Sequence, residues 1–151
     1  MTERDIVEHP EVRPYAQPTS ANLFPSFLLE VKSEAARGTL FAAENQLAVS
    51  GAHRVHSLIH LLDQTAPDRR RCSSDSLVFS LAVSQRQAIA YVHYDNPNND
   101  TYYMSHVDTF PFAKDIQGCR DLVRNAIDWL LEVQQPIVRA VLEKCARVYG
   151  I

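Results

Sequence analysis

Three charged residues at alternate positions form the group best suited to chemistry in this chain. Glu30, Lys32 and Glu34 directly follow an apolar run. Alternate side chains of a β-strand share one face, so the three charges are predicted to lie together, with Leu29 and Val31 pointing the other way into apolar packing. A carboxylate can hold a divalent cation, and a neighbouring ammonium can steady or activate an attacking water. The spacing therefore predicts a metal-dependent phosphodiesterase site.

The apolar residues before these charges decide between two interpretations. The run Phe27-Leu28-Leu29 predicts an internal strand over residues 24–33, and an acid beside a base at the end of an internal strand favours a functional site. The alternative is a solvated pair on an edge strand, which would contribute little stability. Glu34 fits a flanking surface acid better than a ligand.

The rest of the pattern predicts one α/β (α+β) domain. Apolar residues recur at helical spacing over residues 40–62, and Thr39 is the expected N-cap of that helix. Short polar turns then separate three apolar or alternating segments that predict strands, over residues 77–83, 87–94 and 101–112. We therefore expect a mixed central sheet flanked by helices.

The two ends of the chain differ in character. Residues 1–23 are rich in proline and charge and predict an irregular arm, which leaves residues 24–151 as the single domain. A long helical segment is predicted from about 114 to 148, with Pro136 either kinking it or starting a second helix.

Composition limits the cell compartment and the partners. The chain has 151 residues, 46% of them hydrophobic, and a net charge of −3, so any nucleic-acid contact must come from a local basic patch. The three cysteines contain no CxxC pair, and two of them, Cys119 and Cys145, fall on apolar helical positions as expected for buried thiols. With no signal-peptide pattern and no membrane-length apolar run, we expect an intracellular protein, cytoplasmic or nuclear, without membrane contact.

The strand and the helix after it carry a family resemblance. The stretches FLLEVKSEAARGTLFAAENQLAVSGAHRVHSL, LVFSLAVS, YYMSHVDTF and RDLVRNAIDWLL resemble a fungal branch of the PD-(D/E)XK nuclease-like proteins. Glu30-Val31-Lys32 matches the (D/E)xK half of that superfamily's signature, and Gln46 matches an auxiliary glutamine on the following helix. The resemblance covers roughly residues 24–131. It implies a restriction-endonuclease-like core.

The resemblance also implies roles for individual residues. Glu30 and the carbonyl of Val31 would bind one or two Mg2+ or Mn2+ ions, Lys32 would contact the scissile phosphate and the water, and Gln46 would support the site. The superfamily uses a further aspartate from a Pro-Asp dipeptide. No such dipeptide precedes Glu30 here, and Asp5 is the only aspartate before it. Asp5 is therefore the expected further metal ligand.

Two function classes follow from these residues. The first is a metal-dependent nuclease acting on nucleic acid, DNA rather than RNA, with the run Arg69-Arg70-Arg71 contacting the phosphate backbone. The second is a degenerate nuclease fold that serves as a nucleic-acid or protein binding module, because the Pro-Asp half is missing and the net charge is negative. A solvated loop is the bland interpretation of the arginine run. Likewise, His53, His56 and His60 have spacing that suits a transition metal, but an exposed helix face explains them equally.

Overall fold

The computed structural model describes Pro10, Arg13 and residues 26–33, 38–65, 73–99 and 101–149. These residues form a mixed α/β domain, as the sequence predicts. Four strands make one sheet in the order β1-β2-β3-β4, with bounds Phe27–Val31, Val78–Val83, Gln87–Asn96 and Thr101–Pro111. β1 runs parallel to β2, whereas the pairs β2–β3 and β3–β4 are antiparallel. The predicted meander of three strands is thus confirmed.

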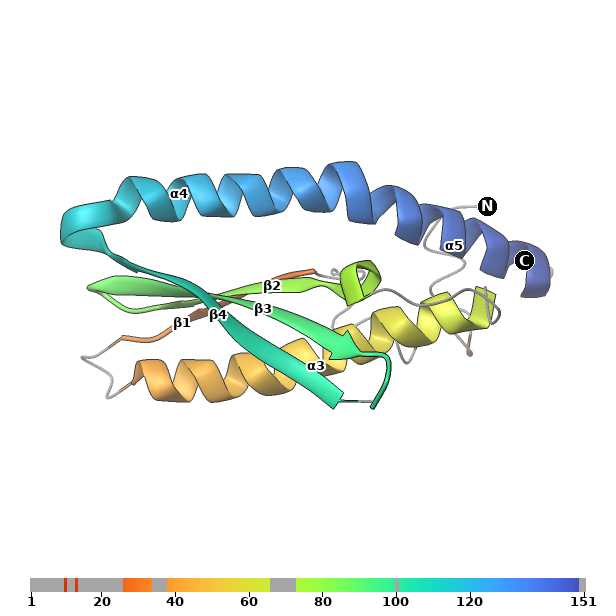
Figure 1. Cartoon of the computed structure of the whole chain (residues 1–151), viewed down its shortest axis with the longest axis horizontal. Coiled ribbons are helices and arrows are strands. Elements are labelled where there is room, and N and C mark those ends of the chain that lie inside the picture. Colours follow the sequence, from red (N-terminus) through yellow and green to blue (C-terminus); the bar gives the residue numbers. More distant parts are fainter. Residues whose placement is uncertain are drawn as a thin grey trace.

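Helices cover both faces of this sheet (Figure 1). α3 (Leu40–Thr65) lies on one face and links β1 to β2 with a short 3-10 turn, η2 (Ser73–Ser76). α4 (Phe112–Trp129), the π-helical turn η3 (Leu130–Gln134) and α5 (Gln135–Tyr149) follow one another as a long rod on the other face. Among the described residues, no helix is both long and apolar enough to cross a membrane.

Local side-chain bonds explain where the helices begin. The Thr39 hydroxyl accepts a hydrogen bond from the Ala42 amide at 3.1 Å, which confirms Thr39 as the N-cap of α3. In α4, Asp115 has non-helical angles (φ −145°, ψ 50°) and its carboxylate accepts from the Gly118 amide at 2.9 Å. The regular part of α4 therefore starts after Asp115, close to the predicted start.

The long rod passes Pro136 through a change of helix type. The Gln135 amide bonds the Leu130 carbonyl, five residues back, which is the π-helical pattern. Pro136 is then the second residue of α5, where its missing N–H is tolerated. The prediction that a second helix begins at Pro136 is confirmed to within one residue. The Gln134 side chain is buried and donates to the Leu77 carbonyl at 2.7 Å, which ties the π-turn to the start of β2.

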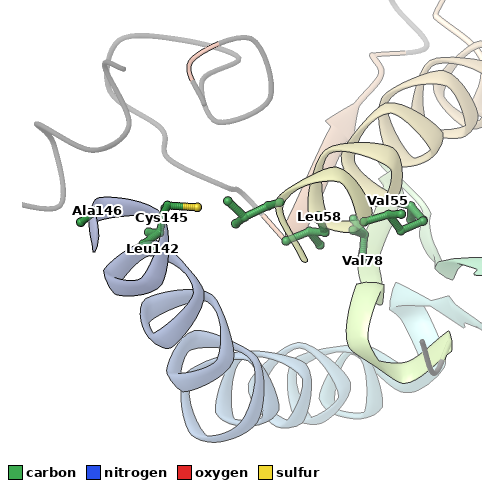
Figure 2. Close-up of a cluster of buried hydrophobic side chains, with 8 residues drawn as sticks. Val55, Leu58, Val78, Leu142, Cys145 and Ala146 are labelled. Carbon is green, nitrogen blue, oxygen red and sulfur yellow. The ribbon is translucent and has the colours of Figure 1, made fainter. Parts of the chain in front are cut away.

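Two apolar clusters hold the helices to the sheet. On the α3 side, α3, α5 and β2 contribute the members of the cluster shown in Figure 2, namely Val55, Leu58, Ile59, Leu61, Val78, Leu142, Cys145 and Ala146. On the other face, α4 packs on the three strands β2, β3 and β4 through Leu81, Ala88, Ala90, Phe110 and Cys119. Cys119 and Cys145 are buried free thiols, as predicted, and burial raises the pKa of each thiol above its ordinary value.

One prediction about β1 is wrong. Leu29 and Val31 were expected in apolar packing, but they are 58% and 61% exposed. They lie on the α4 face of β1, which is the outermost strand of the described sheet. α4 packs further in, over Leu81 of β2 and Ala88 of β3, so it does not cover them. Within the described sheet β1 pairs only with β2, although the sequence predicted an internal strand.

α3 approaches the sheet most closely at a glycine. A Cβ on Gly51 would lie 2.1 Å from Nδ1 of His93, a strand residue that is only 1% exposed. His93 cannot move aside easily, because its Nε2 lies 2.7 Å from the Ser80 hydroxyl in a hydrogen bond. Gly51 is therefore required by space, not by backbone conformation.

Replacing this glycine tests the close approach. We expect Gly51→Ala to lower the free energy of unfolding by about 2 kcal/mol or more, because a methyl group must displace either the His93 ring or the helix. Urea unfolding followed by circular dichroism measures this. Ser50→Ala, at the exposed neighbouring position of the same helix, is the control and should be neutral or slightly stabilising. Equal midpoints for both variants would contradict the packing described here.

Candidate functional site

Glu30 and Lys32 form an ion pair at the end of β1. Lys32 Nζ lies 2.6 Å from Glu30 Oε1, and the side chains of Lys32 and Glu30 are 21% and 31% exposed. The prediction that these two charges share one side of the strand is thus confirmed. Both are half-buried, so the pair differs from a fully solvated surface pair, yet each group still reaches solvent.

The pair lies on the α3 face of the sheet, at the carboxyl end of a parallel strand. Leu28, two residues before Glu30, packs into the apolar clusters beneath α3, and alternation places Glu30 on the same face. The Lys32 amide donates to the Val83 carbonyl at 2.9 Å, which extends the pairing with β2 by one residue. Carboxyl ends of parallel strands are where α/β sheets commonly bind ligands.

A tight return of the chain brings the start of α3 beside Lys32. The Gly38 amide donates to the Ser33 carbonyl at 3.0 Å. A Cβ on Gly38 would lie 3.1 Å from Cβ of Lys32 and 3.0 Å from the Ser33 carbonyl oxygen, so a side chain there would crowd both groups. The amino end of α3, which carries a partial positive charge, is therefore close to the ion pair.

The backbone of Val31 points away from β2. The Phe79 amide donates to the Ser26 carbonyl, and the Lys32 amide donates to the Val83 carbonyl. In a parallel ladder these two bonds direct the peptide groups of the even-numbered β1 residues toward β2. The Val31 carbonyl, at the intervening position, is directed to the other side, as a metal-ligand role requires.

The structure places Gln46 apart from the sheet. Gln46 and Asn45 are exposed on α3, whereas Glu44 is half-buried and its carboxylate accepts a hydrogen bond from the Tyr91 hydroxyl of β3. Glu44 was missed as a site residue. Helical spacing could have found it, because Glu44 follows Leu40 by four residues and borders the buried Ala43.

Tyr91 joins Glu44 to a small polar group on the same face. The His106 ring on β4 meets the Tyr91 ring edge-on at 5.9 Å, and His106 Nε2 lies 2.9 Å from the Thr109 hydroxyl. Burial and the Glu44 carboxylate both raise the pKa of Tyr91 above its ordinary value, so Tyr91 serves as a hydrogen-bond donor and not as a base. The strand registers put Tyr91 in the row next to that of Glu30.

Several predicted residues lie outside the described part of the chain. These are Asp5, Glu34 and the run Arg69-Arg70-Arg71, together with the boundary between the arm and the domain near residue 23. In the described ranges no group of three histidine, cysteine or acidic side chains is placed to hold a metal. Glu30 is therefore the one predicted carboxylate ligand that the structure locates. Of the three spaced histidines, His56 bonds the Tyr102 hydroxyl through Nδ1 at 2.8 Å.

Comparison with known proteins identifies a family but no activity. The profile of a family described as a domain of unknown function, DUF7924, matches residues 4–142. The chain belongs to this family. No curated protein and no solved structure matches it. The match spans β1, α3, the whole sheet and α4, so the elements around Glu30 and Lys32 are part of the DUF7924 domain.

Buried polar groups hold the DUF7924 fold together beneath α3. The Ser76 hydroxyl donates to Asp95 at 2.6 Å, and both are buried. Burial lowers the pKa of the Arg54 guanidinium to about 10, still high enough to keep its charge at neutral pH. Burial also lowers the pKa of the His93 imidazole to about 4, so His93 is neutral in the folded domain.

The depressed pKa of His93 predicts a loss of stability in acid. Between pH 6.5, the ordinary pKa, and about pH 4, the unfolded chain binds a proton at this position and the folded chain does not. Stability should therefore rise with pH across this window, by about 1 kcal/mol per pH unit from His93 alone. Urea unfolding at several pH values measures the slope. His93→Gln should flatten it, and His53→Gln, at an exposed position on α3, should leave it unchanged; equal slopes in wild type and His93→Gln would contradict the assignment.

Proposed function

We propose that this DUF7924 protein hydrolyses phosphodiester bonds in nucleic acid, DNA rather than RNA, with a divalent metal ion. The observation that carries the proposal is the half-buried pair of Glu30 and Lys32, 2.6 Å apart at the carboxyl end of a parallel strand. The resemblance of Glu30-Val31-Lys32 to the PD-(D/E)XK signature supports it. So does the parallel β1–α3–β2 connection, which puts a helix amino end beside the pair.

The donors at the end of β1 fit an ion of the magnesium class. Mg2+ is usually held by one or two carboxylates together with waters and substrate phosphates. Glu30 supplies one carboxylate, and the Val31 carbonyl is directed away from β2, where it can serve as a second ligand. Asp5 remains the proposed further ligand. When bound, the ion would make a water more acidic and offset charge on the phosphate.

Each protein group has a proposed task. Glu30 would fix the cation by its carboxylate. Lys32 would turn its ammonium from Glu30 to the phosphate, where it would stabilise the charge that develops on the oxygens. The amino end of α3 would add a favourable field for the phosphate. Gln46 is exposed, so in this proposal it contacts bound nucleic acid at the rim and not the reacting atoms.

A second candidate function is a binding module without catalysis. The specific observation that favours it is that Lys32 already neutralises Glu30 within the chain. A cation must compete with this ammonium for the carboxylate. In the binding module, the pair would be a structural ion pair and nucleic acid or protein would bind elsewhere on the surface.

Cleavage assays test the catalytic proposal directly. The purified chain should cut single- or double-stranded DNA in the presence of Mn2+ or Mg2+ and stop in excess chelator. Glu30→Gln and Lys32→Met should each reduce the rate by roughly 100-fold or more, as loss of a group that stabilises the transition state does. The exposed pair Glu143→Gln and Lys144→Met on α5 provides matched controls of unchanged activity. Cleavage by Lys32→Met at the wild-type rate would refute the role of Lys32.

Metal binding separates the two candidates. Because the Lys32 ammonium competes for Glu30, Lys32→Met should bind Mn2+ about tenfold more tightly than wild type even though it no longer cuts. Glu30→Gln should lose binding. Titration calorimetry and the rise in melting temperature with Mn2+ measure both effects. If neither wild type nor Lys32→Met binds Mn2+, the nuclease proposal fails and the binding module stands.

A further inference from the structure

A cavity of about 590 Å³ lies between α4 and the sheet, on the face opposite Glu30. Volumes of about 300–1,000 Å³ are typical of small-molecule sites. Every strand contributes to its lining, and α4 contributes residues at helical spacing from Asp115 to Trp129. Because Figure 1 shows α4 running along this face, the cavity is a space enclosed by the helix and the strands beneath it.

The inner part of the cavity is apolar and aromatic. Phe27, Phe79 and Phe110 come from β1, β2 and β4, and alternation places all three on the α4 face. Trp129 of α4 meets the Phe79 ring edge-on, with ring centroids 5.6 Å apart. These side chains are buried or half-buried, so they form a floor suited to an aromatic or branched apolar group.

The outer part of the cavity is acidic. Every charged residue that lines it is an aspartate, namely Asp108 on β4 and Asp115 and Asp121 on α4. Each carboxylate bonds within the described chain through Oδ1: Asp108 to the Thr109 amide, Asp115 to the Gly118 amide, and Asp121 to Gln117 and Arg124. The second oxygens are therefore left to accept from a ligand.

A β-bulge turns Asp108 into this cavity. The register shifts between Ala90 and Tyr91, so that Tyr91 pairs with His106 but Ala90 pairs with Asp108. Without the shift, Asp108 would share the α3 face with His106, two residues away. The extra residue, Val107, moves Asp108 to the face that carries Ala90. Bulges often redirect a side chain to a binding site in this way.

We propose that this cavity binds a small amphipathic cation, an amine or guanidine carried on an aromatic body. The aromatic floor would take the body, and Asp108 at the rim would accept hydrogen bonds from the cationic group. An anionic ligand of the same shape would be rejected by the three aspartates. This site uses no residue of the Glu30–Lys32 pair, so it stands independently of the nuclease proposal.

Three probes of one shape test the charge preference. They are 2-(biphenyl-4-yl)ethylamine, the corresponding alcohol and the corresponding propanoic acid. Trp129 is the single tryptophan of the chain, so its fluorescence reports binding in the cavity. We expect a dissociation constant on the order of 0.1–1 mM for the amine, about tenfold weaker binding of the alcohol, and weaker binding still of the acid.

Two variants locate the binding. Asp108→Asn keeps an oxygen for the Thr109 amide and should remove the preference of amine over alcohol. Ala126→Leu places a larger side chain in the cavity lining and should weaken all three probes. If Ala126→Leu does not fold, Asp108→Asn and the probe series still decide. Equal binding of the three probes, no binding, or an amine preference that survives in Asp108→Asn would overturn the proposal. So would a Trp129 signal that changes with protein concentration alone, since a second copy would then cover the cavity.

Discussion

The close contact between α3 and the sheet at Gly51 is the constraint on which the site face depends. Helix α3 reaches the sheet because Gly51 has no side chain where it meets the His93 ring. The ring itself is held by Ser80, on the neighbouring strand. With α3 seated here, Glu44 one turn and a half earlier reaches Tyr91, and the residues before the helix return onto Lys32. A thicker helix interface would separate all of these groups.

The sheet divides the molecule into two chemically different faces. The α3 face carries the Glu30–Lys32 pair, the Glu44–Tyr91 hydrogen bond and a core with buried polar groups. The α4 face carries an aromatic cavity with an acidic rim. β1 serves both faces by simple alternation, with Glu30 on one side and Phe27 on the other. β4 serves both through its bulge, which places His106 and Asp108 on opposite faces although they are two residues apart.

The long C-terminal rod links the two faces. α4 packs on the sheet through Cys119, and α5 continues past it to pack against the second half of α3 through Leu142 and Cys145. The π-turn and Pro136 lie between these two packing regions, where Gln134 bonds the Leu77 carbonyl. One helix therefore contributes to both apolar clusters, and its change of helix type occurs where its packing partner changes.

Much of the fold could be predicted from the sequence, because local patterns determine local structure. Apolar spacing located α3 and the three antiparallel strands, Thr39 marked a helix start, and the alternation of Glu30 and Lys32 placed both charges on one face. Other features depend on residues far apart in the chain. Periodicity assigns Leu29 to the face opposite Glu30, but only the position of α4 decides that this face is uncovered at β1.

The side chains around the pair show the same limit. Gln46 and Glu44 are both polar residues of one helical turn, and the angle at which α3 crosses the sheet selects Glu44 to meet Tyr91. Asp108 belongs to a strand that the sequence predicts, yet its face depends on a bulge that forms against β3. The sequence by itself determined which segments are helices and strands and which side chains share a strand face. Only the tertiary structure decided which faces are covered and which polar groups meet, because burial and register arise from packing between segments and not within them.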